Sequence, residues 1–187
     1  MRKSFVFFAI SALLGVSSAT SVAAAPSARV DCEVQENGQP ALGSFRVMSG
    51  ETQIAKGSCG RAQEVPPGGY DLQITLDGAI DAPTSKQRVE ARVGELTKAR
   101  ASFETGEILV ELTRDGRRTV GTIRLLRGKD VIATLTAGVT SRVSAGTYSV
   151  EIESRGTRRV LDAITISRAE RRSLSADFSA SGAQASP

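Results

Sequence analysis

Two stretches of the sequence share one pattern, in which a turn rich in proline, alanine or glycine is followed by alternating apolar and polar residues. In the later stretch, Tyr148, Val150 and Ile152 are separated by polar residues, and residues 65–74 repeat the arrangement earlier in the chain. A period of two places the apolar residues on one face of a β-strand. Both stretches therefore predict a turn that begins a half-buried strand.

The sequence also repeats itself over a longer distance. Residues 30–78 align with residues 108–156 at an offset of 78 without a gap, and thirteen positions are identical. The identical residues are mainly turn glycines and core positions, among them Gly43/Gly121, Gly68/Gly146 and Tyr70/Tyr148. At an offset of 75 the copies match again, with Phe103 on Phe178. The chain thus contains a unit of about 75 residues, present twice.

The same alternation runs through the whole second copy and predicts seven short strands, at residues 108–113, 121–125, 131–137, 142–143, 148–152, 160–166 and 174–178. Each strand has one apolar face, which needs a second sheet to cover it. No segment has a convincing helical period. We expect an all-β protein made of two tandem seven-stranded β-sandwiches, immunoglobulin-like or prealbumin-like.

Four segments follow from these boundaries: a signal peptide (1–25), a first module (26–103), a second module (104–179) and a disordered tail (180–187). The join is only Glu104-Thr105-Gly106. Such a short link predicts a stiff rod or a bent pair rather than two freely tumbling modules.

The start of the chain resembles an export signal. Arg2 and Lys3 precede an apolar core and a run of small residues that ends at Ala25. We expect cleavage after Ala24 or Ala25 and a mature protein that is periplasmic or secreted and does not span the membrane. The alternative is that the apolar core stays as a membrane anchor.

The formal charge of +4 includes Arg2 and Lys3, and without them 22 basic residues face 20 acidic ones. A net charge of +2 gives little support to a nucleic-acid partner, and we expect none.

Cys32 and Cys59 align with Val110 and Ala137 of the second copy, which are core-facing positions. A disulfide between them would stabilise the first module by about 3.5 kcal/mol. Two buried thiols are the alternative.

The absence of histidine removes several enzyme classes, because Ser-His-Asp triads, Cys-His pairs and histidine-bound zinc cannot be built. Glu151 and Glu153 lie on the predicted outer face of a strand, where acids are ordinarily solvated. We expect no catalytic residues, no cofactor and no metal.

One resemblance rests on Gly121-x-Ile123-x-Leu125, a turn at Gly128, and then residues 143–152 with their Gly-x-Tyr turn. This run resembles the bacterial PEGA and carboxypeptidase-regulatory-like modules, over residues 29–103 and 106–178. The resemblance implies a prealbumin-like or immunoglobulin-like sandwich in an envelope protein, often as a non-catalytic appendage. Transthyretin-related hydrolases have a similar sandwich, but their chemistry uses histidines.

The second module carries more basic residues than the first. If the strands alternate in direction, two of its loops meet at one end and bring six arginines together: Arg114, Arg117, Arg118, Arg155, Arg158 and Arg159. Guanidinium groups bind phosphate and carboxylate. Our first hypothesis is a structural or protein-binding envelope protein. The alternative is a binder of anionic envelope polymers or lipid head groups through these arginines, and a hydrolase is a distant third.

Overall fold

The computed structural model describes residues 26–179 and is built from β-strands. The predicted signal peptide and tail lie outside these residues. The strands of the first half are β1 (Ala28–Glu36), β2 (Gln39–Ala41), β3 (Gly43–Ser49), β4 (Thr52–Ser58), β5 (Gln63–Val65), β6 (Gly68–Leu76), β7 (Thr84–Ala91) and β8 (Leu96–Phe103). Those of the second half are β9 (Thr105–Arg114), β10 (Arg117–Arg118), β11 (Thr122–Arg127), β12 (Asp130–Leu135), β13 (Ser141–Ser144), β14 (Gly146–Ser154), β15 (Thr157–Ile166) and β16 (Arg171–Asp177).

Each half contains two four-stranded sheets with the same topology. In the first half, β1 pairs with β8 in parallel and with β2 and β5 in antiparallel fashion, and the facing sheet has the order β4-β3-β6-β7. In the second half, β9 takes the place of β1, and the facing sheet is β12-β11-β14-β15. The all-β sandwich prediction is confirmed. Each half has eight strands rather than seven, because a short strand of two or three residues follows the first turn.

The first turn of each half is a tight hairpin. Asn37 and Gly38 have positive φ angles of 53° and 83°, and Asp115 and Gly116 have 52° and 72°. Two consecutive residues with positive φ form the turn that suits a right-twisted hairpin, and asparagine or aspartate followed by glycine is the sequence that adopts it most easily. From this turn the chain continues into the additional short strand, β2 in the first half and β10 in the second.

Close packing explains why Gly43 and Gly121, which correspond in the repeat, are both glycine. A β-carbon added at Gly43 would lie 2.6 Å from the Val34 side chain, and one added at Gly121 would lie 2.6 Å from the Glu153 carbonyl oxygen. No side chain fits at either position. The identity of these two glycines in the sequence therefore follows from the sandwich itself, where the start of the third strand touches its neighbours.

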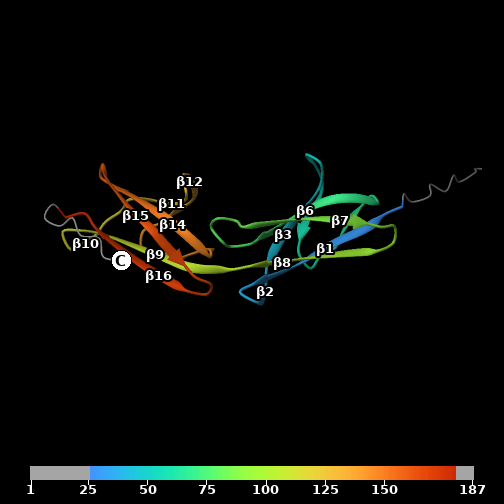
Figure 1. Ribbon diagram of the computed structural model, residues 1–187, viewed down its shortest axis with the longest axis horizontal. Coiled ribbons are helices and arrows are strands. Elements are labelled where there is room, and N and C mark those ends of the chain that lie inside the picture. The colour runs from blue at the N-terminus through green and yellow to red at the C-terminus, as the bar shows by residue number, and fades with distance from the viewer. Residues whose placement is uncertain (1–25, 180–187) are drawn as a thin grey trace, which may run out of the picture.

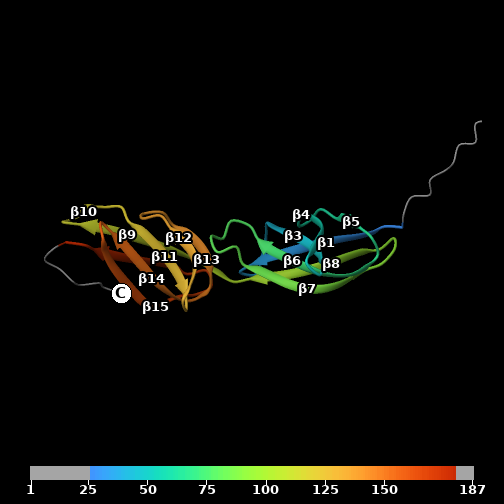
Figure 2. The same cartoon turned by 90° about the horizontal axis from the view of Figure 1, so that it is seen from above.

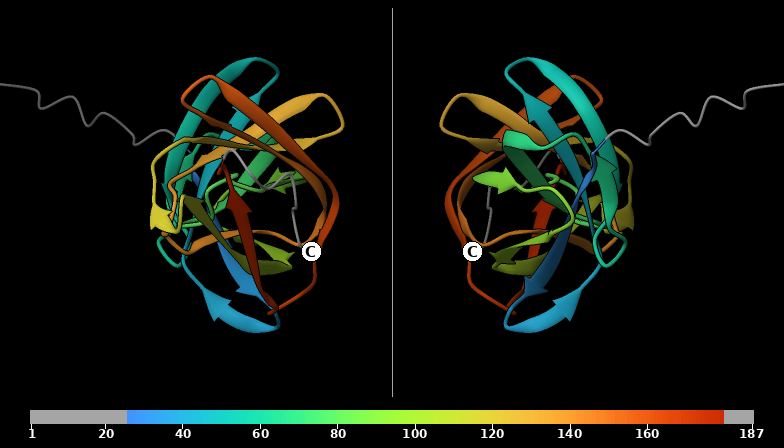
Figure 3. Two further views of the ribbon diagram at one scale, coloured as in Figure 1. Left: turned by 90° about the vertical axis from the view of Figure 1, so that its left-hand side faces the viewer. Right: turned by 90° about the vertical axis from the view of Figure 1, so that its right-hand side faces the viewer.

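Each half has its own hydrophobic core. The first core is made from residues between Ala28 and Ala101, and the second from residues between Ile108 and Phe178. The halves lie end to end along the long axis of the molecule (Figures 1 and 2), and in views along that axis they overlap (Figure 3). Only Glu104 separates β8 from β9, so the link is shorter than the predicted three residues.

Candidate binding surfaces at the ends of the two halves

The two halves meet at a polar contact, here called the joint. Its centre is Asn37, at the tip of the β1–β2 hairpin. The Asn37 side-chain amide donates to the carbonyl oxygen and hydroxyl of Thr105, at 3.1 and 3.2 Å, and accepts from the Thr105 backbone N–H at 3.0 Å. Thr105 is only 1% exposed. These paired bonds satisfy the polar groups that the join would otherwise bury unpaired.

Arg142 of β13 crosses the joint from the second half. One guanidinium nitrogen lies 2.8 Å from Glu36, and the other donates to the Asp77 carbonyl oxygen. The Arg142 carbonyl oxygen accepts from the Ile80 N–H at 2.8 Å. Both carboxylate oxygens of Glu36 bind the second half, because the other one accepts from the Thr105 hydroxyl.

The connection between β6 and β7 extends the joint. Its residues 77–83 reach toward the second half (Figure 2), and Asp81 accepts from the Ser144 N–H at 3.2 Å. The equivalent connection of the second half, between β14 and β15, is only the turn Arg155-Gly156. Arg168, beyond β15, donates to the Asn37 carbonyl oxygen. The sequence alone did not reveal that the connection between β6 and β7 contacts the second half.

The predicted arginine cluster lies at the opposite end of the second half, far from the joint. Four of its six members, Arg114, Arg117, Arg118 and Arg155, line one open hollow of about 450 Å³ together with Asp115 and Thr119. We call this surface the basic end. Arg118 is paired with Glu111 at 3.2 Å, whereas Arg117 and Arg155 have no ion-pair partner within the described part of the chain.

The other two predicted members have different surroundings. Arg158 is ion-paired with Glu151 on the outer face of the β14–β15 sheet. Arg159 lies over the Phe178 ring at 5.0 Å, and Arg114 lies over the same ring at 5.8 Å. Cation–π contacts of this kind tie β9 and β15 to the last residues after β16. The structure therefore brings four of the six arginines to one hollow, stacks Arg159 on the same ring as one of them, and places only Arg158 elsewhere.

Glu151 differs from its sequence prediction. It lies on the outer face, as expected, but it is only 8% exposed rather than solvated. Arg124 lies 2.7 Å from one carboxylate oxygen and Arg158 lies 2.5 Å from the other. Burial alone would raise the pKa of Glu151, but the bonds to Arg124 and Arg158 outweigh it and hold the pKa below its ordinary value. The prediction of a solvated acid was wrong because the cross-strand arginines cover it.

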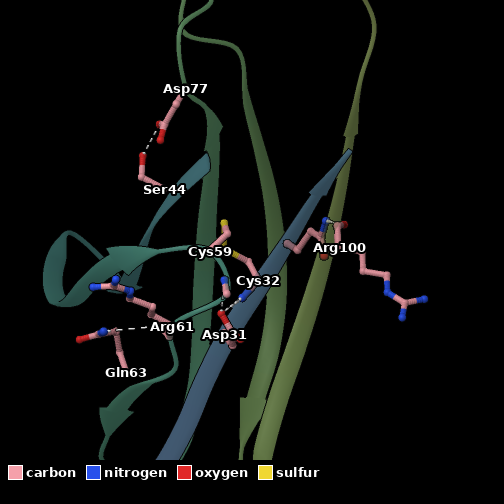
Figure 4. Close-up of a disulfide and its surroundings, with 10 residues drawn as sticks. Asp31, Cys32, Ser44, Cys59, Arg61, Gln63, Asp77 and Arg100 are labelled. Atoms are coloured by element: carbon pink, nitrogen blue, oxygen red, sulfur yellow. Dashed lines mark hydrogen bonds between the residues drawn. A yellow bond between two sulfur atoms is a disulfide. The ribbon is translucent and has the colours of Figure 1, made fainter. Parts of the chain in front are cut away.

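The disulfide predicted between Cys32 and Cys59 is present, with the two α-carbons 4.6 Å apart. It ties β1 to the loop after β4 (Figure 4). Asp31, which is 6% exposed, accepts from the backbone N–H groups of Cys32 and Gly60 at 2.7 and 2.9 Å. The bond from Gly60 holds the loop after β4 against β1, whereas the bond from Cys32 lies within β1. The alternative of two buried thiols is therefore wrong.

The two Gly-x-Tyr turns have a contact that the sequence did not reveal. The Tyr70 hydroxyl donates to the Pro66 carbonyl oxygen at 2.8 Å, and the Tyr148 hydroxyl donates to the Ser144 carbonyl oxygen in the same way. Each tyrosine thus closes the turn that precedes its own strand. Arg127 donates to the Tyr148 hydroxyl at 2.9 Å. Burial raises the pKa of Tyr148, although Arg127 opposes this.

The described residues contain no group of three acidic or cysteine side chains placed to hold a metal ion. Over the same residues, no helix is long and apolar enough to cross a membrane.

Comparison with known protein families and with curated proteins finds no match. Among solved structures, the chain is similar to the Bacillus anthracis TIE protein, with a TM-score of 0.34 and 13% identity over 80% of this chain and 34% of that one. It is also similar to the minor pilin of Streptococcus agalactiae, with a TM-score of 0.36 and 9% identity over 87% and 99% of the two chains. The chain therefore spans about a third of the TIE protein. Likeness at these values supports no statement about family or function.

Proposed function

We propose that this chain is an exported, non-catalytic structural protein of the bacterial cell envelope, whose two halves act as a stiff spacer that presents protein-binding ends at a fixed separation. Its location would be periplasmic or secreted, in line with the export signal and the disulfide. The halves would be modules of the PEGA or carboxypeptidase-regulatory-like kind, as their Gly-x-Tyr turns suggest.

The observation that carries this proposal is the joint. Few contacts usually cross the boundary between two domains that are joined by a flexible linker. Here one residue links the strands, and Asn37, Arg142 and Asp81 bind across the contact from three different segments of the chain. Several bonds from different segments beside a short link resist bending of the two halves against each other. Each contributes a net stabilisation of about 1 kcal/mol.

A distance measurement tests the stiffness. Spin labels on cysteines introduced at Glu51 and Lys129, which are exposed turn residues in different halves, report the separation of the halves. We expect one narrow distance distribution, and a broad one when Asn37→Ala and Arg142→Ala are combined. Arg88→Ala is the matched control, because Arg88 pairs with Asp71 within the first half. A broad distribution in the parent chain would contradict the spacer proposal.

The basic end supports a second candidate function, the binding of anionic envelope polymers or lipid head groups. Four arginines line its hollow, and two of them have no ion-pair partner among the described residues. Replacing Arg117 and Arg155 with serine should then abolish binding to a soluble polyanion such as dextran sulfate at moderate salt, with Arg88→Ser as the control. Unchanged binding, or none in the parent chain, would contradict this function.

A further inference from the structure

The repeat gives the molecule two outer ends that correspond to the two surfaces joined inside it. At the offset of 78 residues, Glu36, Asn37 and Asp77 of the joint correspond to Arg114, Asp115 and Arg155 of the basic end. On the other side, Thr105, Arg142 and Ser144 correspond to Ser27, Glu64 and Pro66, which lie at the end of the first half remote from the joint. We call this second surface the free end.

Strand pairing supports this correspondence independently of the sequence alignment. β5 lies on β1 with Glu64 opposite Arg29, and β13 lies on β9 with Arg142 opposite Glu107. β2 and β10 pair with the ends of β1 and β9 in the same register, because Gln39 faces Glu36 and Arg117 faces Arg114. The backbone that forms the joint is therefore present a second time at the outer ends. Among the described residues no other module covers it there, although at the basic end the Ser179 hydroxyl accepts from the Asp115 N–H at 2.7 Å.

The charges at the two outer ends are the reverse of the charges that meet in the joint. The joint pairs Glu36 of the first half with Arg142 of the second at 2.8 Å. At the outer ends an arginine, Arg114, takes the place of Glu36, and a glutamate, Glu64, takes the place of Arg142. Reversal on one side alone would put like charges together. Reversal on both sides keeps the ends complementary to each other.

The free charges at these ends favour the same contact. Glu64 is exposed and makes no ion pair with any described residue. Arg155 replaces Asp77, whose carbonyl oxygen binds Arg142 in the joint, so a second cation would stand beside Glu64. Opposite charges placed in this way attract and orient two protein surfaces.

We propose that the basic end of one chain binds the free end of a second copy in the geometry of the joint, so that copies associate head to tail. The same two surfaces are used at every step, which makes the contact open-ended rather than closed. The contact should be weaker than the joint. It lacks the loop that carries Ile80 and Asp81, Val93 takes the place of Arg168, and no residue links the two chains covalently.

Sedimentation velocity of the exported chain, at low salt and concentrations up to about 1 mM, tests this inference. We expect the mean mass to rise continuously with concentration and to fall as salt is added, because the contact is electrostatic. Glu64→Arg and Arg155→Glu should each leave the protein monomeric, since each puts like charges opposite one another. An equimolar mixture of the two variants should associate again, because the intact basic end of the first meets the intact free end of the second.

Thermal unfolding of each variant checks that the chain is folded, and Arg88→Glu controls for a change of net charge. A parent chain that stays monomeric at every concentration would overturn the inference. So would self-association that persists in Glu64→Arg. If only Arg155→Glu has an effect, and the effect is on dextran sulfate binding, the basic end binds anionic polymers instead. The spacer function is tested separately, because the distance between labels within one chain does not depend on association.

Discussion

The two halves differ in how they hold one edge strand, β4 in the first half and β12 in the second, against the core. In the second half, β12 buries Ala133 and Leu135 against the core. In the first half, β4 has no buried residue, because Gly57 stands where the second half has Leu135. The side chain of Gln63 lies over Gly57, at 2.8 Å from where a β-carbon would be. A strand that contributes little apolar surface gains little from the hydrophobic effect.

The disulfide compensates for this loss. Cys32 takes the place of Val110 in the second half, and Cys59 follows β4 directly. A bond between β1 and this loop holds β4 near the core, where packing alone holds it weakly. β4, which has little apolar surface to bury, is here called the thin strand. The comparison teaches that the fold tolerates such a strand if a covalent bond reduces the freedom of the unfolded chain. The two halves should accordingly respond differently to reduction, core substitution and acid.

Removing the disulfide should have the largest effect. Cys32→Ala combined with Cys59→Ala should lower the free energy of unfolding of the first half by about 3.5 kcal/mol. The second half should be unaffected, because its core is separate. Denaturant unfolding followed by hydrogen exchange resolves the two halves. Equal destabilisation of both would mean that they unfold as one unit and would contradict this separation.

Exchanging the residues at the thin strand should have the next largest effect. Leu135→Gly should cost the second half about 3 kcal/mol, since it leaves a cavity under β12. In the chain without the disulfide, Gly57→Leu with Gln63→Ser copies Leu135 and Ser141 of the second half and should restore part of the lost stability. Gly57→Leu alone is the control and should not help, because Gln63 occupies that space. A rescue by the single substitution would refute our account of the thin strand.

Acid should distinguish the halves by a smaller amount. The pKa of Glu151 is held below its ordinary value, 4.5, by Arg124 and Arg158 against the effect of burial. Its contribution to stability is therefore present above that ordinary value and is lost as the pH falls through the lowered one. Glu151→Gln should destabilise the second half at neutral pH and reduce its sensitivity to acid, as measured by denaturant midpoints between about pH 6 and pH 3.

The first half offers the matched variant for this experiment. Gln73 takes the place of Glu151 and faces Arg46 across the strands, as Glu151 faces Arg124. Gln73→Glu should therefore make the first half more stable at neutral pH and more sensitive to acid. An unchanged pH dependence in both variants would show that these cross-strand pairs do not contribute.

The strands and their repeat could be predicted from the sequence because they depend on local properties. Alternating residues such as Tyr148, Val150 and Ile152 can bury one face only as a strand, and turns such as Asp115-Gly116 favour the positive φ that a tight hairpin needs. The inward alignment of Cys32 and Cys59 with apolar positions was enough to predict their bond. These features follow from residues close in sequence or from the repeat.

The contacts across sheets and between halves were decided only by the tertiary structure. Arg158 was expected in the arginine cluster, but the strand register places it beside Glu151, with which it forms an ion pair. Nothing local marks Arg142 as the partner of Glu36 or Thr105 as the partner of Asn37, because each pair is far apart in sequence and meets only when both sandwiches are complete. The sequence alone determined which residues face inward and where the chain turns. The fold determined which exposed charges meet, because long, flexible side chains pair according to distances that only the assembled sheets define.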